Sequence, residues 1–600
     1  MDPGTALSVV SLAFQVFSGC IKGCQLLLDA KNLPQKYGYL RHRLRLEQLK
    51  LLDWWDASGF IAETAFEDTQ LDERKQTMVD SLLQIRSITL DISRIKDRYD
   101  LSLKVSDEGR GNDAAVSGGF LEFNSSGTPS KRDKLREKSL RYADAVLKCP
   151  IGLRWAVFDA AKFEQLLARF SELNNSMHLS LELDQRRHYM RLQETSHIQI
   201  LQVHDKLDQI VELIQSLRLS PHCDLTSSSQ GLDQGVPNTL ERLARFKALS
   251  MAASRGELPC EDDVMVQVGL EIPSPGDLEL LLSQIELHGG QRQHGNQRVT
   301  GKYGDTPIWV EWKGYDENTT TLEYRSVGNR ITRLAALLLK HPDTPQELRL
   351  PTSLGYVHDP ASARFGIVFE LPALTETSVP PSLYDRFQIV AKPSLTTRLN
   401  IARKLVIGLE YIHAMKWLHK GLRSDNILFL APSDRDWLSF CLSGFDYSRP
   451  ANPNEMTELP SDNREHDLYR HPDIQFDVPR DGEYGYKEKH DIYSLGVILM
   501  EIGLWQPIHQ FLGISLNRFI RRPIIRGVRC NLLKPESLAI LESETGERYT
   551  DAVKLCLTGN LGGLTSGRES FVFSEEGDKL EESSTGCLQM VQEILQSIKL

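Results

Sequence analysis

The chain has 600 residues and a formal net charge of −11, and its 40% apolar and 25% charged residues are those of an ordinary folded protein. This length exceeds what one hydrophobic core usually holds, so we expect two or more domains. The acidic balance argues against a general nucleic-acid-binding protein, which needs a basic surface to displace counterions. No nucleic-acid partner is therefore expected, although local basic patches stay open.

The nine cysteines are scattered through the chain, and the first residues do not show the basic and then apolar pattern of a secretory signal. This usage is typical of reduced thiols, and it predicts a cytoplasmic protein. Cys20 and Cys24 have helical i,i+4 spacing, but no histidine cluster is near them in the sequence. We interpret them as one face of a helix, and no metal site is expected.

The first 220 residues are predicted to form an all-helical bundle. Residues 5–30 show helical periodicity, and further helical patterns cover 40–55, 71–99, 135–147, 155–190 and 197–219. Residues 106–132 are rich in Gly, Ser, Asp and Asn, which predicts a long loop. The first helix is too short and too interrupted by polar residues for a constitutive membrane span. Leu7, Val10, Phe14, Phe17 and Ile21 recur near the helical period, and they are the candidate residues of a conditional membrane segment.

The segment 221–262 is predicted to be a linker that carries a short helix at 240–253, a candidate brace between domains. From about residue 263 the sequence changes to short β-rich runs, including 306–312 and 366–371, and helices dominate again after residue 395. A second domain, 263–600, is therefore expected, with a small sheet-containing lobe at about 263–372 and a helical lobe at about 373–600.

Residues 411–429 resemble the catalytic loop of protein kinases and the helix before it. The family pattern is His-Arg-Asp, four residues, then Asn. His419, Lys420 and Gly421 occupy the triplet, and Asn426 occupies the asparagine position. Arg423 stands where a phosphate-contacting lysine is usual. The resemblance implies that the catalytic aspartate is replaced by Gly421, which has no group to accept a proton.

Residues 442–449 resemble the Asp-Phe-Gly segment with its first and third residues exchanged. Gly444 stands where the magnesium ligand is expected, and Asp446 lies two positions further on. Residues 490–502 resemble the central helix of the large lobe, in which Asp491 would hold the catalytic-loop backbone. Asp425 and Asp446 are the nearby carboxylates that an atypical active kinase would have to use instead.

In the small lobe, residues 310–313 resemble the kinase strand that ends in the phosphate-binding lysine, which makes Lys313 the vestigial nucleotide-binding residue. Glu311 replaces a small residue that would pack on adenine. The glycines of 288–295 are wrongly spaced to cradle phosphates, and 329–338 contains no acid to pair with Lys313. Glu370 lies in the hinge-like segment. No cofactor is expected to be required, and ATP stays an open alternative.

An N-terminal apolar helix followed by Trp54-Trp55-Asp56 resembles the fungal HeLo domain of incompatibility toxins. This resemblance covers roughly residues 1–220 and implies a membrane effector that is held inactive by a partner domain. Gly19 and Gly23 would allow close packing between helices, as in membranes. No amyloid-like repeat or Asn/Gln-rich segment is present in the sequence.

Three hypotheses follow. The favoured one is a regulated membrane-acting effector of incompatibility or cell death, with a catalytically impaired kinase-like domain as sensor or inhibitor. It implies self-association through the bundle, an anionic membrane surface as the activated partner, and an upstream protein trigger. The alternatives are an interaction scaffold without membrane activity and an atypical kinase that binds ATP.

Overall fold

The computed structural model describes residues 3–30, 37–60, 73–90, 101–103, 131–146, 153–155, 160–218, 236–254, 275–288, 298–315, 321–339, 345–371, 379–430, 436–451, 463–476, 485–516, 519–559 and 584–598. The chain divides into two compact units, the first made largely of residues 1–245 and the second largely of residues 246–600. The narrower boundaries predicted at residues 220 and 263 stay a prediction.

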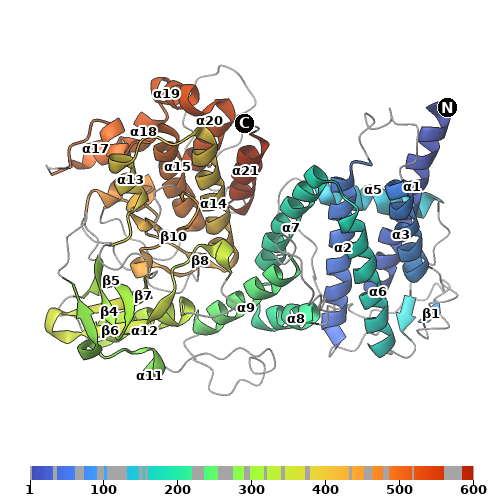
Figure 1. The fold of residues 1–600 in the computed structure, drawn as a ribbon, viewed down its shortest axis with the longest axis horizontal. Coiled ribbons are helices and arrows are strands. Elements are labelled where there is room, and N and C mark those ends of the chain that lie inside the picture. The colour runs from blue at the N-terminus through green and yellow to red at the C-terminus, as the bar shows by residue number, and fades with distance from the viewer. Residues whose placement is uncertain are drawn as a thin grey trace, which may run out of the picture. The chain divides into compact units, whose positions relative to one another are not determined.

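The first unit is a helical bundle, as predicted (Figure 1). Its helices are α1 (Pro3–Leu28), α2 (Gly38–Ser58), α3 (Glu73–Leu90), α5 (Lys131–Val146), α6 (Ala160–Leu179), α7 (Leu183–Val203) and α8 (Leu207–Arg218). Helix α2 is the central element, because it contacts α1, α5, α6, α7 and α8. Accordingly, most of its side chains are buried on all sides.

Polar contacts inside the bundle fix α5 and α7 to α2. The carboxylate of Asp53 is buried, and it accepts hydrogen bonds from Arg132 Nε at 2.7 Å, Ser196 Oγ at 2.6 Å and Gln193 Nε2 at 2.6 Å. Burial raises the pKa of Asp53, and the charge of Arg132 opposes this effect. A buried carboxylate needs such partners, since an unpaired one would be strongly destabilising.

Three details of the bundle differ from the prediction. The helix expected over 155–190 begins only at Ala160, and it ends before a break at residues 180–182 that separates α6 from α7. The helix expected over 197–219 is interrupted at residues 204–206. Two short strands, β1 (Leu101–Leu103) and β2 (Leu153–Trp155), form an antiparallel pair where no strand was expected. Residues 106–130 of the predicted loop at 106–132 lie outside the described part of the chain.

Helix α1 places its aromatic residues inside the bundle. The Phe17 ring stacks on Trp55 with centroids 4.3 Å apart, and Phe14 lies 5.8 Å from Trp55 and 5.3 Å from Tyr142. Ile21 is fully buried. The predicted residues Leu7 and Val10 are also in α1, but their side chains lie outside the described part. None of the helices in the described residues is long and apolar enough to span a membrane.

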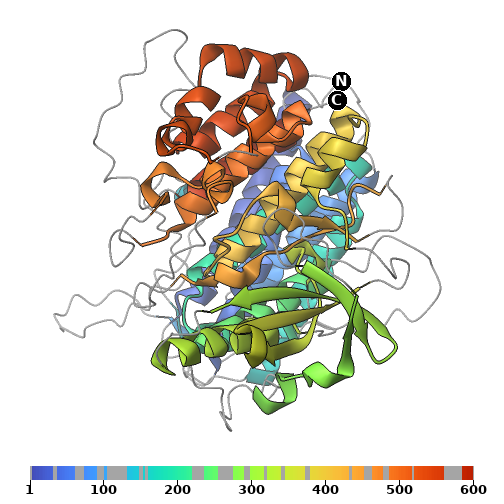
Figure 2. The same ribbon diagram turned by 90° about the vertical axis from the view of Figure 1, so that its left-hand side faces the viewer.

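The second unit begins with a five-stranded antiparallel sheet in the order β3-β4-β5-β7-β6. Its strands are β3 (Ile285–Leu287), β4 (Arg298–Tyr303), β5 (Thr306–Gly314), β6 (Ser353–Asp359) and β7 (Arg364–Glu370). Helix α12 (Thr321–Leu337) packs on β6 and β7. Figure 2 shows this sheet at one end of the unit and the helices of the large lobe at the other.

Alternation along β5 decides which side chains face the large lobe. Ile308, Val310 and Trp312 are buried in one apolar cluster under the sheet. The alternate residues Trp309, Glu311 and Lys313 therefore point to the opposite face, because successive strand side chains alternate. This periodicity puts a carboxylate and an ammonium group side by side on the surface that faces the loops of the large lobe.

The large lobe is mainly helical, as expected, and surrounds α15 (Glu488–Leu504), which contacts α14, α19, α20 and α21. Its other helices are α13 (Leu383–Ile389), α14 (Leu395–Ala414), α16 (Ile508–Phe511), α17 (Arg522–Arg526), α18 (Val528–Leu532), α19 (Pro535–Thr545), α20 (Glu547–Thr558) and α21 (Ser584–Ser597). Short strands β8 (Trp417–Leu418), β9 (Ile427–Phe429), β10 (Phe440–Leu442) and β11 (Arg449–Pro450) form two pairs, β8 with β11 and β9 with β10.

Two further α-helices are described, α9 (Val236–Ser254) and the short α11 (Pro275–Leu278). Helix α9 contains the predicted 240–253 segment. In the second unit, Trp417 Nε1 donates to Ser250 Oγ, which joins the end of α9 to the strand before the catalytic-type loop. The bracing role of this helix between domains stays a prediction.

Candidate functional site

The loop between β8 and β9, which resembles the kinase catalytic loop, is bonded to helix α15. The carboxylate of Asp491 is fully buried and accepts the backbone N–H groups of His419 at 2.8 Å and Lys420 at 2.9 Å. It also accepts from Tyr486 Oη at 2.7 Å, and His413 Nε2 lies 3.2 Å away. One side chain of the central helix thus fixes the start of the loop, the role that the family resemblance implies for Asp491.

Two of these groups have shifted pKa values. Burial alone would raise the pKa of Asp491, but hydrogen bonding and the charge of His413 outweigh it and hold the pKa below its ordinary value. Burial lowers the pKa of His419 to about 4. His419 is therefore neutral near pH 7, and the loop carries no proton donor or acceptor tuned to that range at this position.

Gly421 and Gly444, the two positions that lack carboxylates, are crowded against each other. A Cβ atom at Gly421 would lie 2.5 Å from the carbonyl oxygen of Gly444. A Cβ atom at Gly444 would lie 2.1 Å from Asn426 Nδ2, and Gly444 has a left-handed backbone with φ of +81°. The surrounding atoms therefore leave no room for an aspartate at Gly444 without displacement of Asn426.

Asn426 itself is engaged on both of its polar atoms. Its Nδ2 donates to the carbonyl oxygen of Gly421 at 2.5 Å, and its Oδ1 accepts from Arg298 Nη2 at 2.6 Å. In active kinases this asparagine is a magnesium ligand. Here the oxygen that would face the metal faces a guanidinium group.

Arg298, at the start of β4, is the functional residue that the sequence analysis missed. Its Nε lies 2.6 Å from Glu311 Oε1, and its Nη1 donates to the carbonyl oxygen of Asp425 at 2.7 Å. Glu311 also accepts from Ser443 Oγ and from the backbone N–H of Gly444 at 3.2 Å. We call Arg298, Glu311, Asn426 and Ser443 the inter-lobe cluster, because it joins the sheet to both loops.

The inter-lobe cluster keeps its charges. Burial alone would raise the pKa of Glu311, but the charge of Arg298 and the bonds from Ser443 and Gly444 hold it below its ordinary value. Burial alone would lower the pKa of Arg298, but Glu311 and Asp425 raise it. The pair is thus a buried ion pair, and removal of one partner would leave an uncompensated charge.

The other predicted nucleotide-binding residues lie around this cluster. Lys313 Nζ is over the ring of Tyr447, 3.3 Å from its centroid. Helix α12 carries one acidic residue, Glu323, in its first turn, outside the predicted segment 329–338, and the Glu323 side chain lies outside the described part. Glu370 ends β7 opposite Ile308, and its backbone N–H donates to the carbonyl oxygen of Thr352 at 2.9 Å.

Of the two remaining candidate carboxylates, Asp425 and Asp446, only Asp425 has a described side chain. Arg423 Nε lies 2.9 Å from Asp425 Oδ1, so the Asp425 carboxylate is paired within the loop. Asp446 lies in the 3-10 turn Phe445–Tyr447, and its side chain is outside the described part. The predicted glycine-rich stretch at 288–295 lies between β3 and β4, outside the described residues from 289 onward.

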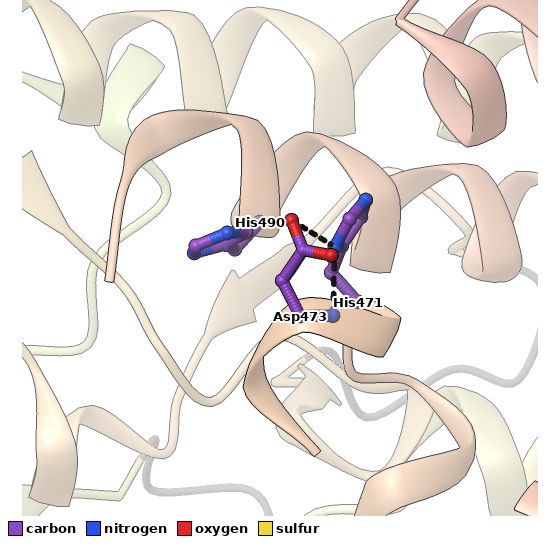
Figure 3. A group of neighbouring side chains, drawn as sticks. All are labelled: His471, Asp473 and His490. Carbon is purple, nitrogen blue, oxygen red and sulfur yellow. Dashed lines mark hydrogen bonds and ion pairs between the residues drawn. The ribbon is translucent and has the colours of Figure 1, made fainter. Parts of the chain in front are cut away.

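Figure 3 shows a separate group, His471, Asp473 and His490, whose potential ligand atoms lie within 4.8 Å of one another. His471 Nδ1 accepts the backbone N–H of Asp473 at 3.2 Å, and His490 Nδ1 accepts that of Lys487 at 3.0 Å. Lys489 Nζ lies 3.4 Å from Asp473. Both Nδ1 lone pairs are thus used to cap helices, so we assign this group a capping role.

The first unit is similar to a known family. Residues 4–213 match the family model named HeLo, described as prion-inhibition and propagation. The match begins in α1 and ends within α8, so it takes in nearly all of the helices described for the bundle.

The chain is also similar to protein kinases, at low identity. It is 32% identical over 189 residues to "Receptor-like protein kinase 7" of Arabidopsis thaliana, covering 29% of this chain and 17% of that protein. It is 27% identical over 114 residues to "Serine/threonine-protein kinase 10" of Xenopus tropicalis, covering 19% and 11%. A probable serine/threonine-protein kinase of Dictyostelium discoideum is 30% identical over 107 residues, covering 18% and 22%. The matched part of the chain thus spans less than a quarter of the length of each of these relatives.

Proposed function

We propose that this protein is a regulated effector of the fungal incompatibility or cell-death type, in which the kinase-like unit restrains a membrane-active HeLo domain. The observation that carries the proposal is the HeLo match over residues 4–213. The burial of Phe17 and Ile21 in α1 supports it, because a membrane-seeking segment has to be hidden in the resting protein. Self-association of the bundle and an upstream protein trigger belong to the same proposal.

The inter-lobe cluster supports a regulatory kinase-like unit that transfers no phosphate. Gly421 and Gly444 supply no carboxylate, and Arg298 lies against the asparagine that would hold magnesium. The buried pair of Arg298 and Glu311 lies within the small-lobe sheet, and its hydrogen bonds to Asn426 and Ser443 join that sheet to the large lobe. A signal that breaks these bonds would change how the lobes are joined, and a two-state element of this kind can bias a second domain.

The decisive experiment measures dye release from anionic liposomes. A protease site is inserted in the sequence between residues 219 and 235, so that the chain folds whole and is then cut. We expect the intact chain to cause no dye release and the cut chain to cause dye release. Leakage before cutting would contradict restraint. Silence after cutting, with the first unit still folded by circular dichroism, would favour the scaffold hypothesis.

One substitution in α1 tests where the activity lies. Leu12 is 52% exposed, so Leu12→Glu puts a charge on the proposed membrane segment with little effect on packing. The matched control is Leu183→Glu, on α7, where the leucine is 64% exposed. We expect leakage by the cut chain to be lost in Leu12→Glu and kept in Leu183→Glu. Equal leakage by both would rule out α1 as the acting segment.

A thermal-shift measurement tests whether the chain binds ATP. We expect no thermal shift of the intact chain with magnesium and ATP, because Arg298 and Glu311 fill the region around Asn426. A double variant, Arg298→Ala with Glu311→Ala, removes both charges together and leaves Lys313 in place. ATP-dependent stabilisation of the unaltered chain, or phosphate transfer by it, would contradict the proposal and favour an atypical kinase.

A further inference from the structure

A basic segment of the large lobe contrasts with the acidic chain. Five of the twelve residues from Arg518 to Arg529 are arginine, and residues 502–535 contain no aspartate or glutamate, although the chain carries a net charge of −11. We propose that this segment forms a binding surface for anionic membrane lipids. We call it the arginine–phenylalanine surface, and its described members are Arg464, Phe519, Arg521, Arg522, Ile524 and Arg526.

Phe519 is held in an exposed position. Its side chain is 75% exposed, whereas the next residue, Ile520, is buried and fixes the backbone to the lobe. The guanidinium carbon of Arg464 lies 3.7 Å from the centroid of the Phe519 ring, and Arg464 Nη1 donates to the carbonyl oxygen of Ile520 at 2.8 Å. A large apolar ring is thus presented to solvent with a positive charge stacked on it.

Helix α17, at the outer edge of its unit in Figure 1, adds further charge and apolar area. Ile525 is fully buried and anchors the helix, whereas Ile524 is 37% exposed. Arg521, Arg522 and Arg526 are exposed. Within the described residues, neither Arg521 nor Arg526 has an acidic side chain at ion-pair distance. The guanidinium groups of Arg521 and Arg526 therefore add to one positive field instead of cancelling against neighbouring acids.

The combination of charge and exposed apolar side chains favours a lipid surface over a soluble polyanion. Each arginine near an anionic membrane contributes about 1 kcal/mol, and an aromatic ring gains further by entering the headgroup region. A soluble polyanion such as heparin would use the arginines but would leave Phe519 and Ile524 in water. The inference goes beyond the proposed function, which places membrane contact in the HeLo domain, because this surface belongs to the kinase-like unit.

The test is co-sedimentation of the intact chain with vesicles, either of phosphatidylcholine alone or mixed with phosphatidylserine. We expect binding to the mixed vesicles only. The double variant Arg521→Gln, Arg526→Gln should weaken it roughly thirtyfold, which corresponds to two arginine contributions. Phe519→Ser should weaken it about tenfold, since one buried aromatic side chain is lost. The matched control is Ile389→Ser, where the isoleucine is 79% exposed on α13.

Four outcomes would overturn the inference. They are absence of binding, equal binding to both vesicle types, unchanged binding by the variants, and competition by soluble heparin combined with no effect of Phe519→Ser. The last outcome would assign the surface to a soluble polyanion. Leakage by the cut chain tests the HeLo domain and not this surface. If the cut chain causes no leakage, the sedimentation result can therefore still be interpreted.

Discussion

At the scale of single residues, the most informative positions are the glycines of the two loops. A missing carboxylate is visible in the sequence, because both positions fall in ordered motifs. Arg298 is not visible in the same way, since it lies on β4 and meets Glu311 only through the register of two neighbouring strands. A buried acid on β5 would have signalled the need for a cation, but only the strand pairing identifies which residue supplies it.

Restoring the magnesium aspartate should damage the fold and yield no activity. Gly444→Asp would bring its Cβ within 2.1 Å of Asn426 Nδ2 and would place a side chain at φ of +81°. We expect a loss of roughly 2 to 4 kcal/mol of unfolding free energy and no phosphate transfer, also when combined with Gly421→Asp. Chemical unfolding and a radiolabelled transfer assay measure the two effects.

The control for this variant is Gly513→Asp. Gly513 also has a positive φ, +65°, but a Cβ atom there would meet nothing within 4 Å. The difference in unfolding free energy between the two variants therefore measures the effect of crowding apart from backbone strain. Equal stability loss in both would show that the crowding at Gly444 is relieved easily, contrary to our expectation.

A second prediction at this scale concerns Glu501 in α15. Burial raises its pKa to about 8, although Tyr469 Oη and the backbone N–H of Ile508 donate to Oε1 at 2.7 and 2.8 Å. The folded state therefore keeps a proton that the unfolded state has lost above its ordinary carboxyl pKa. By linkage, unfolding free energy should fall as the pH rises from about 5 to about 8, and level off above that range.

The measurement is the unfolding free energy at several pH values for the unaltered chain and for Glu501→Gln. The glutamine does not titrate, so this variant should lose the Glu501 contribution, which is on the order of a few kcal/mol across the range. Parallel pH profiles for the two proteins would show that Glu501 is not the responsible group.

At the scale of elements, sequence periodicity found the helices but not all of their ends. The break before α7 contains no glycine or proline; Glu182 and Gln185 form a capping box there instead. The break before α8 likewise lies in a polar stretch that suits a continuing helix. Strands β1 and β2 have three residues each, too few for an alternating pattern, and they lie far apart in the chain. Their pairing depends on tertiary contacts.

Packing of α1 on α3 depends on Gly23. A Cβ atom there would lie 2.6 Å from Thr89 Oγ1 and 2.8 Å from the backbone carbon of Thr89. Close approach inside the bundle therefore accounts for this glycine without any membrane packing. We expect Gly23→Ala to reduce the unfolding free energy of the first unit by about 1 to 3 kcal/mol.

The control is Gly586→Ala in α21, where a Cβ atom would meet nothing within 4 Å. Alanine favours a helix over glycine by up to about 1 kcal/mol, so this variant should be neutral or slightly more stable. Thermal unfolding followed by circular dichroism compares the two. A stable Gly23→Ala variant would mean that α1 and α3 can separate without loss.

At the scale of the whole molecule, the division into a helical bundle and a kinase-like unit was predictable, because length, texture change and ordered motifs all indicate it. The two units have separate cores, and we expect calorimetry of the intact chain to show two unfolding transitions. Gly23→Ala should lower one transition and Gly444→Asp the other. If both substitutions lowered the same transition, the two cores would unfold as one cooperative body, against this expectation.

The crowding at Gly444 also bears on the history of the chain. With Asn426 packed against Gly444 and Arg298 bonded to Asn426, a single reversion to aspartate meets occupied space and does not recover a metal site. Under the function proposed above, a gain of catalysis would require several coordinated substitutions, and the first of them would lower stability. Absence of phosphate transfer would then behave as a ratchet, and descendants of this unit would be free to diversify only in what they bind and release.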